Sequence, residues 1–149
     1  ICTNTLHKVA PQVQSRIRVP LVHIAEAAAD ELCVKGISRV GLLGTKYTMT
    51  QEFYREKLTA SGIDVLIPEG EEIDLVNRVI FDELCLGVVK PDSKAAYLDV
   101  IANLQARGAQ GILLGCTELG LIVSQEDVVL PLFDTTVIHA KRALALALE

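Results

Sequence analysis

The sequence has no tryptophan, and phenylalanine and tyrosine together make up only 4% of its 149 residues. It also lacks an excess of positive charge, because 14 Lys and Arg stand against 19 Asp and Glu and give a formal net charge of -5. A surface that holds phosphate backbones needs clustered basic residues, so we expect no nucleic-acid partner. No apolar run approaches the ~20 residues that a bilayer requires, so we expect no membrane segment.

Cysteine is scarce as well. The cysteines are Cys2, Cys33, Cys85 and Cys116. They show neither the density of a disulfide scaffold nor the CxxC or Cys/His spacing of a zinc site. We therefore expect a reducing cytoplasm, no metal, and Cys33 and Cys85 as small apolar side chains in the core. The first residue is Ile, and we expect the chain to be a fragment with no secretory or transit segment.

Apolar residues make up 50% of the sequence, and the mean hydropathy is +0.37, which favours strands buried on both faces. Short apolar runs bounded by Gly or Pro alternate with segments of helical period, the pattern of a parallel α/β sheet covered by helices. The expected strands are 39–44, 63–68, 111–115 and 128–131. The expected helices are 24–35, 50–60, 72–86, 93–107 and 136–148. Gly36, Gly62, Gly87 and Gly108 are placed to end helices.

An internal repeat indicates two related lobes. Cys2-Thr3, followed by residues 19–21 (VPL) and a helix, is similar to Cys116-Thr117, followed by residues 130–132 (LPL) and a helix. We therefore expect two pseudo-symmetric α/β lobes, with 23–131 forming the second lobe and 1–22 plus 132–149 a remnant of the first. By analogy between the copies, about 75 residues of the first lobe are missing.

Cys116 follows the apolar run 111–115 and so lies at the carboxyl end of a buried strand, where open parallel sheets bind ligands. Free N–H groups in the turn after a strand favour a thiolate. If the two lobes face each other, the first copy of the repeat approaches the same ligand from the opposite side. Such a pair, roughly 6–7 Å apart, removes a proton from one face of a carbon and returns one to the other.

Three segments, residues 2–7 (CTNTLH), 42–49 (LLGTKYTM) and 115–119 (GCTEL), resemble the aspartate/glutamate racemase family, especially its L-aspartate/glutamate-specific branch. The resemblance spans the whole chain and corresponds to the last two-thirds of a family member. It implies a cofactor-independent, usually dimeric enzyme that uses a thiol/thiolate pair, without pyridoxal phosphate, on a small amino acid substrate.

The first motif departs from the family pattern Cys-Asn-Thr-x-His. Residues 4–7 (NTLH) match it in a register that puts Thr3 at the first acid/base position, whereas the internal repeat pairs Cys2 with Cys116. Adjacent residues of a strand point to opposite faces, so Cys2 and Thr3 cannot both reach the substrate. We favour Thr3 and keep Cys2 as the alternative. A hydroxyl is much harder to deprotonate than a thiol, so we expect Cys116, as thiolate, to take the proton of the L-amino acid and Thr3 to return one.

The resemblance also assigns residues that hold the substrate's carboxylate and amine. They are Asn4, Thr5, Thr45, Thr48 and Thr117, with Tyr47 lining the same loop and Glu118 orienting the second motif. Short polar residues also cap helices and close turns, so capping is an alternative for Thr45 and Thr48. We interpret His7 and His139 as structural histidines.

An acidic substrate needs a cation. The family uses a lysine on a helix of the second lobe, and this sequence has no clear match for it. Lys90 and Lys94 follow that helix in a connection that we expect to be exposed. The predicted function is interconversion of L- and D-aspartate or glutamate, faster from L to D. The alternatives are a single-thiol decarboxylase or isomerase on the same scaffold and a non-catalytic small-molecule binding domain.

Overall fold

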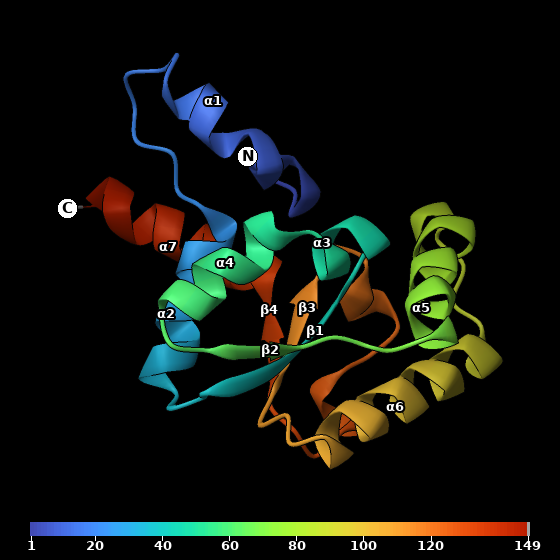
Figure 1. The fold of residues 1–149 in the computed structure, drawn as a ribbon. Helices are drawn as coiled ribbons and strands as arrows, with labels where there is room; N and C mark the ends of the chain where they lie inside the picture. Colours follow the sequence, from blue (N-terminus) through green and yellow to red (C-terminus); the bar gives the residue numbers. More distant parts are fainter. Residues whose placement is uncertain (149) are drawn as a thin grey trace.

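Four short parallel strands form the centre of the structure, a computed structural model that describes residues 1–148. The strands are β1 (Arg39–Gly44), β2 (Asp64–Leu66), β3 (Ile112–Gly115) and β4 (Leu132–Asp134), in the order β2-β1-β3-β4. β1 pairs in parallel with β2 and β3, and β3 pairs in parallel with β4. The expected parallel α/β sheet is confirmed, and helices flank it on both sides (Figure 1).

The helices are α1 (Ala10–Gln14), α2 (Ile24–Val34), α3 (Lys46–Thr50), α4 (Glu52–Ala60), α5 (Glu71–Asp82), α6 (Pro91–Ala106) and α7 (Thr135–Leu148). α2 and α4 cover one face of the sheet, and α5 and α6 cover the other (Figure 1). Within residues 1–148, none of these helices combines the length and the apolar character needed to cross a membrane.

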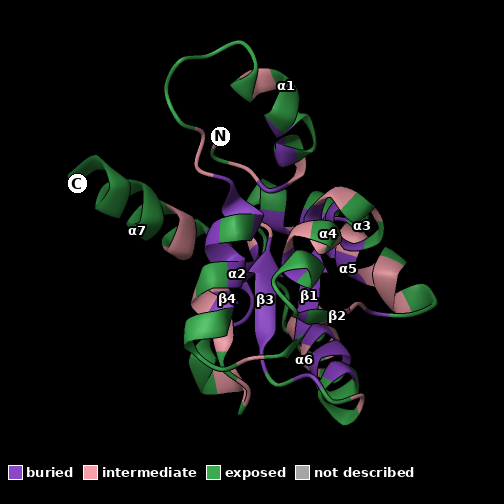
Figure 2. Ribbon diagram, turned by 60° about the vertical axis from the view of Figure 1, so that its left-hand side comes forward, coloured by how far each residue is buried: buried purple, intermediate pink, exposed green. Residues whose placement is uncertain are grey.

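Alternating side chains of the central strands build a core on each face. In β1, Val40 and Leu42 pack with residues of α2 and α4, whereas Leu43 packs with α5 and α6. In β3, Leu113 belongs to the first of these clusters and Leu114 to the second. This is the period-two pattern of a strand covered on both sides, and it explains why the runs are almost uninterruptedly apolar. β3 is correspondingly buried along its length (Figure 2).

Two segments extend beyond the sheet. Residues 1–22 comprise a 3-10 turn (Thr5–Val9), α1 and an extended stretch, and α1 stands clear of the strands (Figure 1). α7 packs against α2, while its C-terminal end is exposed (Figure 2). Residues 132–134 form β4 and pair with β3, so they share the sheet of residues 23–131. The wider division of the chain into two lobes stays a prediction.

The expected strand at 128–131 is wrong, because the strand lies at 132–134. The side chain of Gln125 explains the difference. Its Nε2 donates to the carbonyls of Val128 and Leu130 at 3.2 and 3.0 Å, and its Oε1 accepts from the Leu132 amide at 2.9 Å. The Gln125 side chain thus forms hydrogen bonds with backbone groups that a neighbouring strand would otherwise bind. Val129 is 91% exposed, so this run does not lie in the core. The apolar run is therefore a loop.

The other expected elements are present with shifted ends. The segment 50–60 is divided at Gln51, whose extended backbone separates α3 from α4. The helix expected to end at 86 stops at Asp82 and is followed by a 3-10 turn, Leu84–Leu86. The predicted stops Gly36, Gly62, Gly87 and Gly108 all have positive φ, as a left-handed helix end requires.

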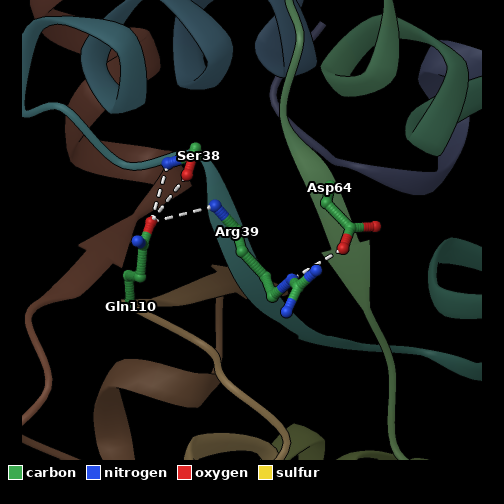
Figure 3. A network of polar contacts seen from close by, with 4 residues as sticks. All are labelled: Ser38, Arg39, Asp64 and Gln110. Carbon is green, nitrogen blue, oxygen red and sulfur yellow. Dashed lines mark hydrogen bonds and ion pairs between the residues drawn. The ribbon is translucent and has the colours of Figure 1, made fainter.

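The amino ends of the strands, opposite the carboxyl edge, are joined by a polar network (Figure 3). Gln110 Oε1 accepts from the Ser38 amide at 2.8 Å, the Ser38 hydroxyl at 3.2 Å and the Arg39 amide at 3.1 Å. Arg39 Nε donates to Asp64 at 2.7 Å. Gln110 precedes β3, Arg39 begins β1 and Asp64 begins β2, so the network ties three strands in register.

We expect Gln110→Ala to lower the free energy of unfolding by about 1–2 kcal/mol, because the Ser38 and Arg39 amides lose their acceptor. Asp64→Asn is the matched control, since it breaks an ion pair whose side chains are 48% and 55% exposed and so should cost less than about 1 kcal/mol. Urea denaturation of both variants measures the difference. Equal losses would contradict the role given to Gln110.

Candidate active site

The carboxyl ends of β1 and β3 place the candidate catalytic loops side by side. Gly44 of β1 lies opposite Gly115 of β3. A Cβ on Gly115 would come within 2.9 Å of the Leu43 carbonyl oxygen, and a Cβ on Gly44 within 2.9 Å of the Gly115 carbonyl oxygen. Only glycine allows the strands to approach this closely, and Thr45 and Cys116 follow directly where the strands end.

A cleft of about 480 Å³ opens at this edge of the sheet. Most of the site residues predicted from the sequence line it, and they come from the N-terminal segment, the β1–α3 junction and the loop after β3. The lining residues are Thr3, Asn4, Thr5, Thr45, Tyr47, Ile80, Phe81, Cys85, Gly115, Cys116, Thr117 and Glu118. The chain thus brings together residues that are more than a hundred positions apart in the sequence.

Three threonine hydroxyls meet at one side of the cleft. The Thr5 oxygen lies 3.3 Å from those of Thr45 and Thr48, and the latter two are 3.2 Å apart. Thr45 also caps α3 by accepting from the Thr48 amide, so it serves both of the roles considered for it. Thr48 is fully buried beneath the lining. These contacts are long for O–H···O bonds, so the Thr5 and Thr45 hydroxyls, which line the cleft, can turn toward an anion.

Asn4 is 3% exposed and anchors the N-terminal segment. Its Nδ2 donates to the Thr135 hydroxyl at 3.0 Å, and that hydroxyl donates to the Leu114 carbonyl at 2.8 Å. Asn4 is therefore tied to the start of α7 and through it to β3. Its Oδ1 is buried and has no hydrogen-bond partner among residues 1–148, so one acceptor of the cleft wall is left unused.

The Cys116 side chain contacts a carboxylate of its own motif. Its Sγ donates to Glu118 Oε2 at 3.0 Å, and the Thr117 hydroxyl donates to the same oxygen at 2.6 Å. Burial, followed by the contact with Glu118, raises the pKa of Cys116 to about 12. The hydrogen bonds from Cys116 and Thr117 lower the pKa of Glu118, which is a carboxylate. The sequence could not show that the acid of the motif holds the thiol hydrogen.

Thr3 and Cys2 face different cavities. Thr3 lines the cleft together with Cys116. Cys2 instead lines a second, mainly apolar hollow of about 530 Å³ between the 13–24 segment and α7. Residues 1–4 form no strand, so the strand alternation expected for this pair is absent, and the two neighbours diverge in an irregular segment.

All three histidines of the chain meet behind the N-terminal segment. The ring of His7 lies 4.7 Å from that of His23 and 5.6 Å from that of His139. His7 is 1% exposed, and its Nδ1–H donates to the Thr3 carbonyl at 2.7 Å. His139 Nε2–H donates to the Val22 carbonyl at 2.8 Å. His7 thus holds the backbone of Thr3 at the cleft, and His139 holds that of Val22.

We expect acid to destabilise the fold through this cluster. Burial and the neighbouring His7 lower the pKa of His23 to about 4, with His139, Glu26 and Lys57 as the other groups that face it. An unfolded histidine titrates near 6.5, so this contribution is complete above about pH 6.5 and is lost as the pH falls toward 4, by about 2–3 kcal/mol. Protonation of Nδ1 also removes the acceptor that caps α2 through the Ala25 amide.

Urea denaturation near pH 7 and near pH 4.5 measures this loss. His23→Asn keeps a capping acceptor at the start of α2 but cannot titrate in this range. Its free energy of unfolding should depend less on pH than that of the parent protein. A variant that loses as much stability in acid as the parent would show that the histidine cluster is not responsible.

Comparison with known proteins adds to this geometry. Residues 1–143 match the Asp/Glu/hydantoin racemase family. The chain belongs to this family. A Yersinia pestis protein described as an Asp/Glu racemase is 49% identical, with a TM-score of 0.95, over 99% of this chain and 65% of its own. An aspartate racemase homologue from Pyrococcus horikoshii is 40% identical, with a TM-score of 0.89, over the same shares.

The chain described here therefore spans about 65% of the length of these two relatives. An aspartate racemase from Picrophilus torridus, 23% identical with a TM-score of 0.72 over 98% of this chain and 60% of its own, has the same fold. The parallel sheet flanked by helices is thus the sheet of Asp/Glu racemase structures.

Three cleft residues, Ile80, Phe81 and Cys85, were not predicted from the sequence. Cys85, expected in the core, is exposed and lines the cleft in the turn after α5, beside Ile80 and Phe81. The apolar sequence 84–86 concealed it, because α5 ends before this turn. Cys33, also expected in the core, is exposed on α2. The sequence pattern around Cys33 and Cys85 does not show that these two side chains face solvent and not the core.

The lysines considered for the substrate carboxylate lie outside the cleft lining. Lys90 pairs with Glu83 at 3.2 Å, and Lys94 pairs with Asp127 at 2.8 Å. Lys90 is exposed, as expected, whereas Lys94 lies within α6 and is partly buried, so the exposed connection expected for Lys94 is wrong. Glu118 is the only charged side chain among the described residues that line the cleft.

Proposed function

We propose that this chain carries catalytic residues of a cofactor-independent amino acid racemase, with aspartate or glutamate as substrate. Membership of the family supports racemisation, and the name of the Pyrococcus horikoshii relative, 40% identical, supports an acidic substrate. The observation that carries the proposal is that Thr3 and Cys116 line one cleft while Cys2 lines another.

In this proposal Cys116 exchanges a proton with one face of the substrate's α-carbon and Thr3 exchanges one with the other. The hydroxyls of Thr5 and Thr45, which line the cleft, turn toward the α-carboxylate, and the buried Thr48 supports them from beneath. The thiol is the stronger acid of the reacting pair, so its conjugate base is the more accessible one at neutral pH. Removal of the proton by Cys116 from the L-amino acid is therefore the easier step, and the return by Thr3 completes inversion.

Chirality imposes one constraint on the two directions. The enantiomers have equal free energies, so kcat/KM is the same from L to D as from D to L. The difference between Cys116 and Thr3 therefore affects kcat and KM together, with a higher kcat from the L-enantiomer.

The test uses the protein expressed from its complete natural gene, incubated separately with L- and D-aspartate and L- and D-glutamate and with no added cofactor. Chiral chromatography should show each opposite enantiomer appearing, and deuterium from heavy water should enter the α-position. Binding without exchange would indicate a silent binding domain. Conversion of a malonate-type or unsaturated acid instead would indicate a single-thiol decarboxylase or isomerase. Either result would overturn the proposal.

A further inference from the structure

The resting state of Cys116 raises a chemical problem for proton abstraction. Proton abstraction requires the thiolate, because a neutral thiol is a very weak base, but the sulfur here keeps its hydrogen, which it donates to Glu118 Oε2 at 3.0 Å. The Thr117 hydroxyl fixes this oxygen from the other side at 2.6 Å. Glu118 therefore holds the thiol hydrogen, and its negative charge opposes formation of a second anion beside it.

An amino acid zwitterion carries the group that can change this arrangement. Its α-ammonium is a cation with three N–H donors, and Glu118 is the only charged side chain among the described residues that line the cleft. Both existing hydrogen bonds use Oε2, and neither uses Oε1. The side chain is only partly buried, so an incoming donor can reach it.

We propose that Glu118 is a proton gate for Cys116. In the free cleft, Glu118 binds the thiol hydrogen and keeps Cys116 protonated. When an amino acid binds, Glu118 releases the thiol and binds the ammonium group of the amino acid instead. This inference rests on the proposed function and names the residue that couples binding to activation of the thiol. When the ammonium takes the carboxylate, the S–H bond breaks, the electron pair stays on sulfur and the proton leaves through the open cleft to solvent. The thiolate then lies beside a carboxylate whose charge the ammonium neutralises.

The gate has a functional consequence beyond the chemistry. A free thiolate in an open cleft would react with electrophiles and peroxides, whereas a thiol that is held by Glu118 does not. Ionisation only in the complex restricts the reactive form to the time when substrate covers it. Glu118 thus affects the reaction by controlling when Cys116 is ionised.

The first experiment measures ionisation of Cys116 without substrate. The protein from its natural gene is alkylated with iodoacetamide across a pH series, and mass spectrometry follows the peptide that contains Cys116, separately from the other three cysteines. We expect Glu118→Gln, which removes the charge but keeps the shape, to move the midpoint of alkylation down by about 1–3 pH units. Asp127→Asn is the control, because it neutralises a carboxylate that binds Ser124 and Lys94 outside the cleft lining.

The second experiment tests release of the proton by an ammonium group. The probes are α-methylaspartate, which has no α-hydrogen to react, and citramalate, which carries a hydroxyl in place of the ammonium. We expect α-methylaspartate to lower the Cys116 midpoint in the parent protein and to have little further effect in Glu118→Gln, while citramalate leaves it in place.

An unchanged midpoint in Glu118→Gln would overturn the holding step. No shift with α-methylaspartate, or equal shifts with both probes, would overturn the release step. These readouts do not depend on turnover. A protein that fails to racemise but shows both shifts contradicts the proposed function alone, and a racemase that shows neither contradicts the gate alone.

Discussion

Replacement of Cys116 by alanine should lower kcat for racemisation of the natural protein by about 10²–10⁴-fold, the contribution of a positioned acid or base. The sulfur lines the cleft at the carboxyl end of β3, and none of the threonine hydroxyls there can replace it as a base at neutral pH. The hydroxyls that would hold the carboxylate lie on other segments, so KM should change much less than kcat.

Cys33→Ala is the matched control, because Cys33 is an exposed thiol on α2 that is not among the cleft residues. Its kcat should equal that of the parent. Comparison of kcat and KM for the two alanine variants, with circular dichroism to check the fold, decides the point. A Cys116→Ala variant with parental turnover would remove the thiol from the mechanism.

Replacement of Thr3 by valine should separate proton exchange from inversion. Valine keeps the branched shape but removes the hydroxyl, so no group remains to donate on the second face of the α-carbon. Cys116 can still remove the proton of the L-amino acid and return a deuteron to the same face. In heavy water, the variant should therefore incorporate deuterium into L-aspartate with retained configuration, while formation of D-aspartate falls by about 10²-fold or more.

Cys2→Ala is the control for this experiment, since Cys2 lines the other hollow. It should racemise at the parental rate. If Cys2→Ala loses inversion and Thr3→Val retains it, the alternative assignment of Cys2 as the second acid/base is correct. Mass spectrometry of the separated enantiomers measures deuterium content and inversion in the same sample.

The architecture could be predicted from the sequence where burial is uniform. β1 and β3 are apolar because helices cover both their faces, and such runs stand out in any sequence. The strand at β4 could not be located, because its position depends on Gln125, a side chain that satisfies the backbone of a neighbouring apolar run. The periodicity of apolar residues gives no information about a hydrogen bond from a side chain to the backbone.

The candidate site divides in the same way. Motif spacing predicted that Thr45 and Cys116 lie at one edge of the sheet, because parallel strands end together there. Thr5 reaches the same cleft from a segment that forms no strand. The approach of Cys85 could not be predicted, since it depends on where α5 stops. The protonation of Cys116 also depends on a single distance, 3.0 Å to Glu118, and on burial, neither of which is encoded in the order of residues.

The proposed mechanism requires a thiol and a hydroxyl on opposite faces of one α-carbon. Wash-in of α-deuterium at saturating concentration from L-aspartate and, separately, from D-aspartate, catalysed by the unmodified natural protein, distinguishes it from a mechanism with two matched bases. We expect faster wash-in from the L-enantiomer, with kcat/KM for racemisation equal in the two directions. Equal wash-in rates from both enantiomers would contradict it, because they require two bases of equal strength.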